Sequence, residues 1–213
     1  FLKRIVFVKR HVWFFRIYIG APFSKPNFSQ GESMPMFFSS ETAFLRAEGA
    51  LRGWNMGGTA QELYEQGVTL SFTERGVSGV GKYLSDNTST PEDYTSPVES
   101  SRLSYQVQTE ITVAWEESAP FEEKLERIIT QKWIANFPLG FEAWSDYRRT
   151  GYPEIFPVVD NLSNGVISTS RQQRRLPFPL KEKQANSENV KAAVSMLGGS
   201  DTGATDLWWA KKN

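Results

Sequence analysis

Two adjacent helical patterns joined by a glycine-containing turn constrain the fold of this chain more than any other feature. The first spans about residues 40–53, where apolar positions recur with the spacing of one helical face. The second begins at Thr59, which forms a capping-box pattern with Glu62 three residues later, and it continues to about Arg75. The run Asn55-Met56-Gly57-Gly58 breaks the helix between them. The sequence therefore predicts an antiparallel helical hairpin.

Large and small apolar residues in this hairpin follow the register of a tetratricopeptide unit, whose period is about 34 residues. The residues in this register are Phe44, Ala47, Leu51, Ala60, Tyr64 and Gly67. A single unit of this kind cannot bury its own apolar face, so we expect neighbouring elements to cover it.

The remaining patterns predict a mainly α fold, with tetratricopeptide-like helix pairs, long irregular loops and one short β-hairpin. Residues 76–118 are rich in polar and turn-forming side chains and read as a long ordered loop. Further helices are predicted over about residues 119–136, 141–149 and 187–197. Asn164-Gly165, flanked by valine-containing runs, is typical of a hairpin turn.

Composition excludes several kinds of site. The chain has no Cys and only one His, His11, so it lacks the residues for Cys-ligated zinc, iron–sulfur clusters and multi-His metal sites. We therefore expect no metal and no cofactor. The 24 basic and 24 acidic side chains cancel, which argues against a nucleic-acid partner.

The first 19 residues differ from the rest of the chain. Residues 1–19 contain five basic side chains and no acidic one, and their apolar run from Val12 to Ile19 is too short to span a bilayer. We treat 1–19 as an atypical basic segment and 20–213 as one region. Because the chain does not begin with Met, we expect it to be a fragment of a longer protein.

Two patterns suggest catalysis only weakly. Gly76 to Lys82 fits the first seven positions of a phosphate-binding loop, but Tyr83 replaces the required Ser or Thr, and a predicted helix stands where a strand should precede it. A pair of carboxylates for glycoside hydrolysis is possible near residue 120, although acids at a helix start more often cap the helix. These acids are Glu116, Glu117, Glu122 and Glu123. We expect a protein that is not an enzyme.

Four aromatic residues in or beside the long loop are the candidate ligand-binding residues. They are Tyr83, Tyr94, Tyr105 and Trp115. Aromatic faces stack on the apolar faces of sugars, and mixed apolar and polar pockets are typical of small-ligand sites. The alternative is that these rings only attach the loop to the helices. We expect Trp54, Trp133 and Trp144 to belong to the core.

Two arginine pairs, Arg148-Arg149 and Arg174-Arg175, can bind an anion or a carboxylate through their forked donors. A structural role is favoured, because Arg149 lies three residues after Asp146 and can pair with it on a helix.

Two neighbouring runs, residues 131–138 (QKWIANFP) and 142–153 (EAWSDYRRTGYP), are specific enough to compare with known families. They resemble the C-terminal signature of the SusD/RagB family of outer-membrane glycan-binding lipoproteins. The resemblance continues at residues 23–27 (FSKPN), 44–54 (FLRAEGALRGW), 174–179 (RRLPFP), 197–199 (LGG) and 207–209 (LWW).

This resemblance implies non-catalytic binding of an oligosaccharide at the bacterial cell surface and its delivery to a TonB-dependent transporter of the SusC type. It also implies an outer-membrane lipoprotein, although the lipid-bearing Cys is not in this sequence. Family members are usually over twice this length, so we expect the C-terminal portion of such a protein. The matched motifs Trp133, Trp144, Arg148, Arg149, Arg174 and Arg175 are expected to be architectural. The alternative function is a protein-interaction scaffold that docks the transporter or an N-terminal half.

Overall fold

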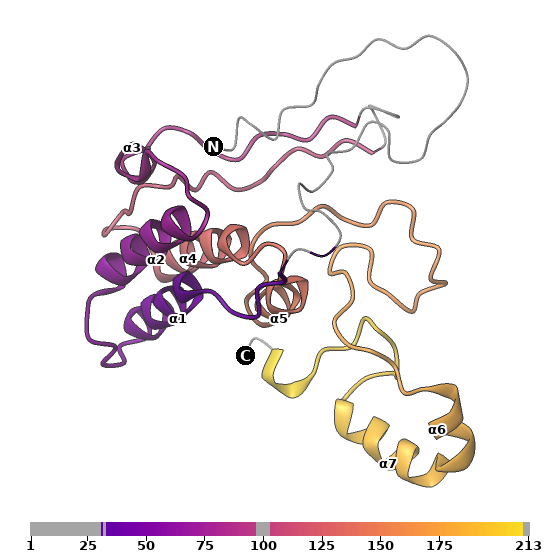
Figure 1. The fold of residues 1–213 in the computed structure, drawn as a ribbon. Coiled ribbons are helices and arrows are strands. Elements are labelled where there is room, and N and C mark those ends of the chain that lie inside the picture. Colours follow the sequence, from indigo (N-terminus) through magenta and orange to yellow (C-terminus); the bar gives the residue numbers. More distant parts are fainter. Residues whose placement is uncertain (1–30, 32, 97–102, 211–213) are drawn as a thin grey trace. The chain divides into compact units, whose positions relative to one another are not determined.

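The computed structural model describes Gly31 and residues 33–96 and 103–210, so the basic segment 1–19 lies outside the described residues. The described residues form seven α-helices, one short 3-10 helix and two isolated β-bridges, as expected for a mainly α fold (Figure 1). They divide into two compact units between Ala119 and Pro120.

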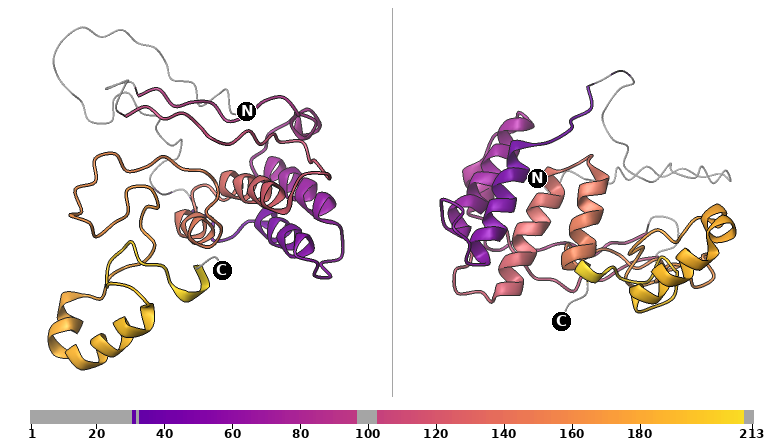
Figure 2. Two further views of the ribbon diagram at one scale, coloured as in Figure 1. Left: turned by 180° about the vertical axis from the view of Figure 1, so that it is seen from behind. Right: turned by 90° about the horizontal axis from the view of Figure 1, so that it is seen from below.

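The helical hairpin of the first unit is present as predicted. Helix α1 (Ser39–Leu51) and helix α2 (Ala60–Glu74) lie side by side (Figures 1 and 2). The capping box is complete: the Glu62 amide donates to the Thr59 hydroxyl over 3.1 Å, and the Glu62 carboxylate accepts from the Thr59 amide over 2.8 Å. This reciprocal pair fixes where α2 begins.

The core of the first unit lies between these helices. Phe44 of α1 meets Tyr64 of α2 edge to face, with ring centroids 6.2 Å apart. Gly67 lets the two helices approach closely, because a Cβ there would lie 2.8–2.9 Å from the Phe44 ring. The Tyr64 hydroxyl donates to the Val113 carbonyl over 2.7 Å, which attaches the long loop to the hairpin.

The loop after α2 contains one element that the sequence did not predict, helix α3 (Val80–Leu84). The glycine run before it forms a helix exit and a turn, with positive φ at Gly76 and Gly79. Because α2 and no strand precedes these glycines, the run lacks the context of a phosphate-binding loop.

The second unit begins with helix α4 (Phe121–Ala135) and helix α5 (Gly140–Thr150), close to the predicted bounds. A buried ion pair joins them: Lys132 Nζ lies 2.8 Å from an Asp146 carboxylate oxygen, and both side chains are almost fully covered. Helix α5 ends at Gly151, which adopts the left-handed conformation that favours glycine.

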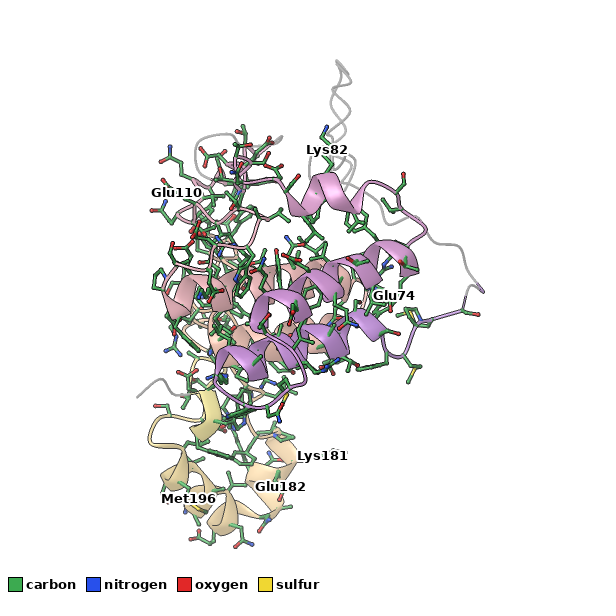
Figure 3. All side chains as sticks on the ribbon, turned by 90° about the vertical axis from the view of Figure 1, so that its left-hand side faces the viewer. Glu74, Lys82, Glu110, Lys181, Glu182 and Met196 are labelled. Carbon is green, nitrogen blue, oxygen red and sulfur yellow. The ribbon has the colours of Figure 1, made fainter. Side chains whose placement is uncertain are left out.

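The rest of the second unit contains helix α6 (Leu180–Ala185), helix α7 (Ser187–Leu197) and a 3-10 helix, η2 (Trp208–Ala210). Figure 3 labels Lys181 and Glu182 on α6 and Met196 on α7. The predicted bounds of the last helix coincide with those of α7, whereas α6 was not predicted.

The predicted β-hairpin forms its turn but no strands. Asn164 and Gly165 both have positive φ, and the Val166 amide donates to the Ser163 carbonyl over 3.2 Å. No strand flanks this turn among the described residues. One backbone hydrogen bond beyond the turn joins the two arms, from the Val158 amide to the Thr169 carbonyl over 2.8 Å. This backbone pairing goes no further in the described part of the chain, and Val166 and the neighbouring Leu162 are exposed, so the arms bury little apolar surface against each other.

Two tryptophans expected in the core are instead exposed: Trp54 and Trp133 expose 61% and 44% of their surface. Trp208, in the run 207–209, exposes 83%. Trp54 lies in the turn after α1. Trp133 lies about 140° around α4 from the buried Ile128, so it faces away from it. Trp144 is half-buried, and its indole N–H donates to the Gln173 carbonyl over 2.7 Å.

Candidate functional site

Two of the predicted ligand-binding rings pack on aromatic residues of the hairpin. Trp115 lies 5.3 Å from the Tyr64 ring, and Tyr83 lies 5.2 Å from the Phe72 ring, measured between ring centroids. Both rings are half-buried. The Trp115 indole N–H donates to Glu117 over 2.6 Å. Each ring is therefore held in place by packing while keeping some exposed surface.

The other two predicted residues form the β-bridge of the loop. The Tyr94 and Tyr105 backbones exchange two hydrogen bonds of 2.9 and 2.8 Å in an antiparallel arrangement. Residues paired in this way project their side chains on the same side of the ladder. The structure thus brings Tyr94 beside Tyr105, a pairing that the sequence did not predict.

A backbone hydrogen bond connects the segments that carry the first two rings. The Ala114 amide donates to the Asp86 carbonyl over 2.9 Å, which joins the chain after Tyr83 to the chain before Trp115. Hydrogen bonds from the Ser89 amide and the Thr88 amide hold the pKa of the Asp86 carboxyl well below its usual range. The first unit therefore places a fixed anion and several polar groups near these segments.

Each of the four glutamates considered for catalysis has a hydrogen-bond or ion-pair partner within its own unit. Glu117 accepts from Trp115, and Glu116 accepts from the Ser118 amide over 3.1 Å. In the second unit, Glu122 accepts from the Tyr152 hydroxyl over 3.0 Å and Glu123 pairs with Arg127 over 3.0 Å. Both lie in the first turn of α4, the capping position expected for them.

The arginine pairs belong to a network within the second unit. Arg149 pairs with Asp146 over 3.0 Å, which confirms the predicted helical pairing. Arg174 pairs with Asp206 over 2.7 Å and also donates to the Arg148 carbonyl.

Arg175 pairs with Asp201 over 2.6 Å, and Lys183 lies 2.7 Å from the other oxygen of the same carboxylate. Both Arg174 and Arg175 are buried, and their acidic partners are distant in sequence. These side chains therefore fix the course of the chain between α5 and η2.

Neither a cluster of metal ligands nor a membrane-spanning helix occurs among the described residues. No group of three or more His, Cys, Asp or Glu side chains is placed to hold a metal ion in this part of the chain. None of the helices that the structure describes combines the length and the apolar character needed to cross a membrane.

Comparison with known proteins identifies the family. Residues 18–210 match the model of the SusD-like family, described as Susd and RagB outer membrane lipoprotein. A search of curated proteins found no significant match.

Solved structures similar to this chain include a chitin-binding SusD homolog from Flavobacterium johnsoniae, with 55% identity and a TM-score of 0.75 over 82% of this chain and 36% of that one. A SusD homolog from Bacteroides uniformis has 49% identity and a TM-score of 0.84 over 90% of this chain and 40% of that one. A SusD-like protein from Bacteroides thetaiotaomicron has 51% identity and a TM-score of 0.78 over 84% of this chain and 38% of that one.

The chain therefore spans less than half the length of these relatives. The match extends over both compact units and includes every run from residues 23–27 to residues 207–209 that resembles the family. The chain belongs to the SusD/RagB family of outer membrane lipoproteins.

Proposed function

We propose that this chain is part of a non-catalytic protein that binds an oligosaccharide at the outer-membrane surface and delivers it to a TonB-dependent transporter of the SusC type. The observation that carries the proposal is family membership, together with 55% identity to a structure described as a chitin-binding SusD homolog. A chitin oligosaccharide is therefore the first ligand to test.

The aromatic residues of the first unit are the proposed contacts. Tyr83 and Trp115 are held against rings of the hairpin, and Tyr94 is paired with Tyr105 through the backbone. Because these rings are positioned before a ligand arrives, stacking a sugar on them costs little side-chain ordering. The polar groups beside them are suited to hydrogen bonds with sugar hydroxyls.

The test is a titration of the full chain with chitooligosaccharides and with a panel of other neutral oligosaccharides. Binding is measured by calorimetry and by the change in Trp fluorescence. We expect saturable binding of at least one glycan. We expect Tyr94→Ala and Trp115→Ala to weaken it about fivefold or more, since truncation of an aromatic anchor typically costs over 1 kcal/mol.

The matched control is Trp208→Ala, which removes an exposed ring from the second unit. It should leave the affinity unchanged. A folded chain that binds no glycan of the panel contradicts the proposal, as does equal weakening by the control variant. Circular dichroism of each variant separates loss of binding from loss of folding.

A protein-interaction scaffold is the second candidate function. It is favoured by exposed apolar side chains around α6 and α7, where Leu176, Leu180 and Met196 are 69%, 69% and 80% exposed. Co-purification with a SusC-like transporter, weakened by Leu180→Ser and Met196→Ser but not by Trp115→Ala, supports docking through this surface.

A further inference from the structure

The second unit contains a cavity of about 460 Å³ between α5, the segment before α6 and η2. Its volume lies within the range of small-molecule sites, about 300–1,000 Å³. Four of its lining residues are arginines, and one is an acid. These residues are Arg148, Arg149, Arg171, Arg174 and Asp206.

Two carboxylates in this region each form ion pairs with two cationic side chains. Asp206 pairs with Arg174 over 2.7 Å and also with Arg171. Asp146, which pairs with the cavity-lining Arg149 over 3.0 Å, also pairs with Lys132 over 2.8 Å. The positive charges around the cavity therefore exceed the negative charges that neutralise them.

Arg148 is the clearest case of this excess. It forms no ion pair with any residue that the structure describes, and its protein hydrogen bond is a 3.2 Å contact to the Arg174 carbonyl. Its Nε is buried and has no hydrogen-bond partner. Burial and the nearby Arg174 lower the pKa of the Arg148 guanidinium, as expected where a positive charge is poorly compensated.

The Arg148 side chain is nevertheless held in one place. Its guanidinium lies 3.6 Å from the centroid of the Trp144 ring and 4.9 Å from that of Trp209. Such contacts orient an arginine without using its N–H donors. A fixed guanidinium with unused donors is suited to the forked recognition of an oxyanion.

We propose that this cavity binds the carboxylate of a small organic acid, such as a sugar acid. Arg148 and Arg171 supply donors to the carboxylate, and the remaining volume accommodates the organic body of the ligand. Arg171 is placed to engage an entering anion, because 52% of its side chain is exposed. This site lies within the second unit and does not depend on the aromatic site proposed above.

The test is calorimetric titration of the full chain with glucuronate, with glucose and inorganic phosphate as parallel ligands. Glucose is the neutral counterpart of glucuronate, and phosphate is an oxyanion without an organic body. We expect glucuronate to bind, glucose not to bind, and the glucuronate affinity to fall as salt concentration rises. Equal binding of glucose, or binding of phosphate without glucuronate, overturns the proposal.

Variants locate the site. Arg171→Gln should weaken glucuronate binding about tenfold or more, since hydrogen bonds to charged groups contribute about 1.5–3 kcal/mol. Arg148→Met, which keeps much of the packing on Trp144, should do the same. Lys191→Gln removes a positive charge on the exposed surface of α7 and should have no effect. Unchanged affinity in folded Arg171→Gln and Arg148→Met, or equal loss in the Lys191 control, contradicts the assignment.

Discussion

The carboxylate of Glu74, in the last turn of α2, caps the first turn of α1 through Ser40. Its oxygens accept from the Ser40 hydroxyl over 2.7 Å, from the Ser40 amide over 3.2 Å and from the Ser39 amide over 2.6 Å. The residue before α1 is Phe38, which offers no side-chain cap. Helix α1 therefore obtains its N-terminal cap from the neighbouring helix, and the negative charge also suits the positive end of the helix dipole.

Loss of this carboxylate should destabilise the hairpin. We expect Glu74→Ala to lower the free energy of unfolding by about 1–2 kcal/mol, the usual cost of removing a cap. Glu74→Gln should cost less, because its amide oxygen still accepts a hydrogen bond. Urea unfolding followed by circular dichroism measures both changes. Gln66→Ala, on the exposed side of α2, is the control; a Glu74→Ala chain as stable as this control contradicts the capping role.

Gly67 should tolerate no side chain. In Gly67→Ala the added Cβ meets the Phe44 ring at 2.8–2.9 Å, so the helices must separate, and overpacking of this kind costs about 1–3 kcal/mol. The control is Gly81→Ala in α3, where a Cβ has open space. It should be neutral or slightly stabilising, because Ala favours a helix over Gly. Thermal unfolding of the two variants distinguishes a packing effect from a general effect of replacing glycine; equal midpoints count against close packing.

The helices with strong local patterns were predictable. The capping box marks the start of α2, and Gly198, in a left-handed conformation, marks the end of α7. Helices α3 and α6 were missed because five and six residues are too few to show a helical period. The turn at Asn164 was predictable from its residue type, but a turn cannot determine whether the flanking chain pairs.

The site was less predictable than the fold, because its contacts are distant in sequence. The Arg149–Asp146 pair follows from helical spacing, whereas Arg174 meets Asp206 only after the intervening chain has folded back. The pairing of Tyr94 with Tyr105 depends on a bridge between segments that have no strand pattern. Sequence indicated the residue types of the site and the one partner that helical spacing determines, but not the partners that are distant in sequence.

Asp146 should be the more critical member of the buried ion pair with Lys132. In Asp146→Asn, the buried Lys132 ammonium loses its carboxylate, and breaking a buried pair typically costs about 3–5 kcal/mol. In Lys132→Met, Asp146 keeps its second partner, Arg149, so we expect a smaller loss. Urea unfolding measures both variants.

The exposed pair of Lys191 and Glu188 provides the control for this comparison. Lys191 Nζ also lies 2.8 Å from a Glu188 carboxylate oxygen, but the two side chains are 73% and 83% exposed. Glu188→Gln should therefore change the free energy of unfolding very little. A loss in Lys132→Met as large as that in Asp146→Asn would mean that Arg149 does not support the carboxylate.

Asp201 should make the second unit sensitive to acid. Burial by itself raises the pKa of this carboxyl, but hydrogen bonds from Lys183, Arg175 and the Phe178 amide outweigh it and lower the pKa to about 2. A folded-state pKa below the unfolded value of about 3.9 means that the stabilisation is complete above that value and is lost as pH falls toward 2. We therefore expect Asp201→Asn to destabilise the chain at pH 6 and to flatten the fall of its thermal midpoint between pH 5 and pH 2.

The control is Asp160→Asn, which removes an exposed aspartate of the same unit and should leave the stability at pH 6 close to wild type. An Asp201→Asn chain whose midpoint falls as steeply in acid as that of the wild type would show that this carboxylate does not couple folding to pH.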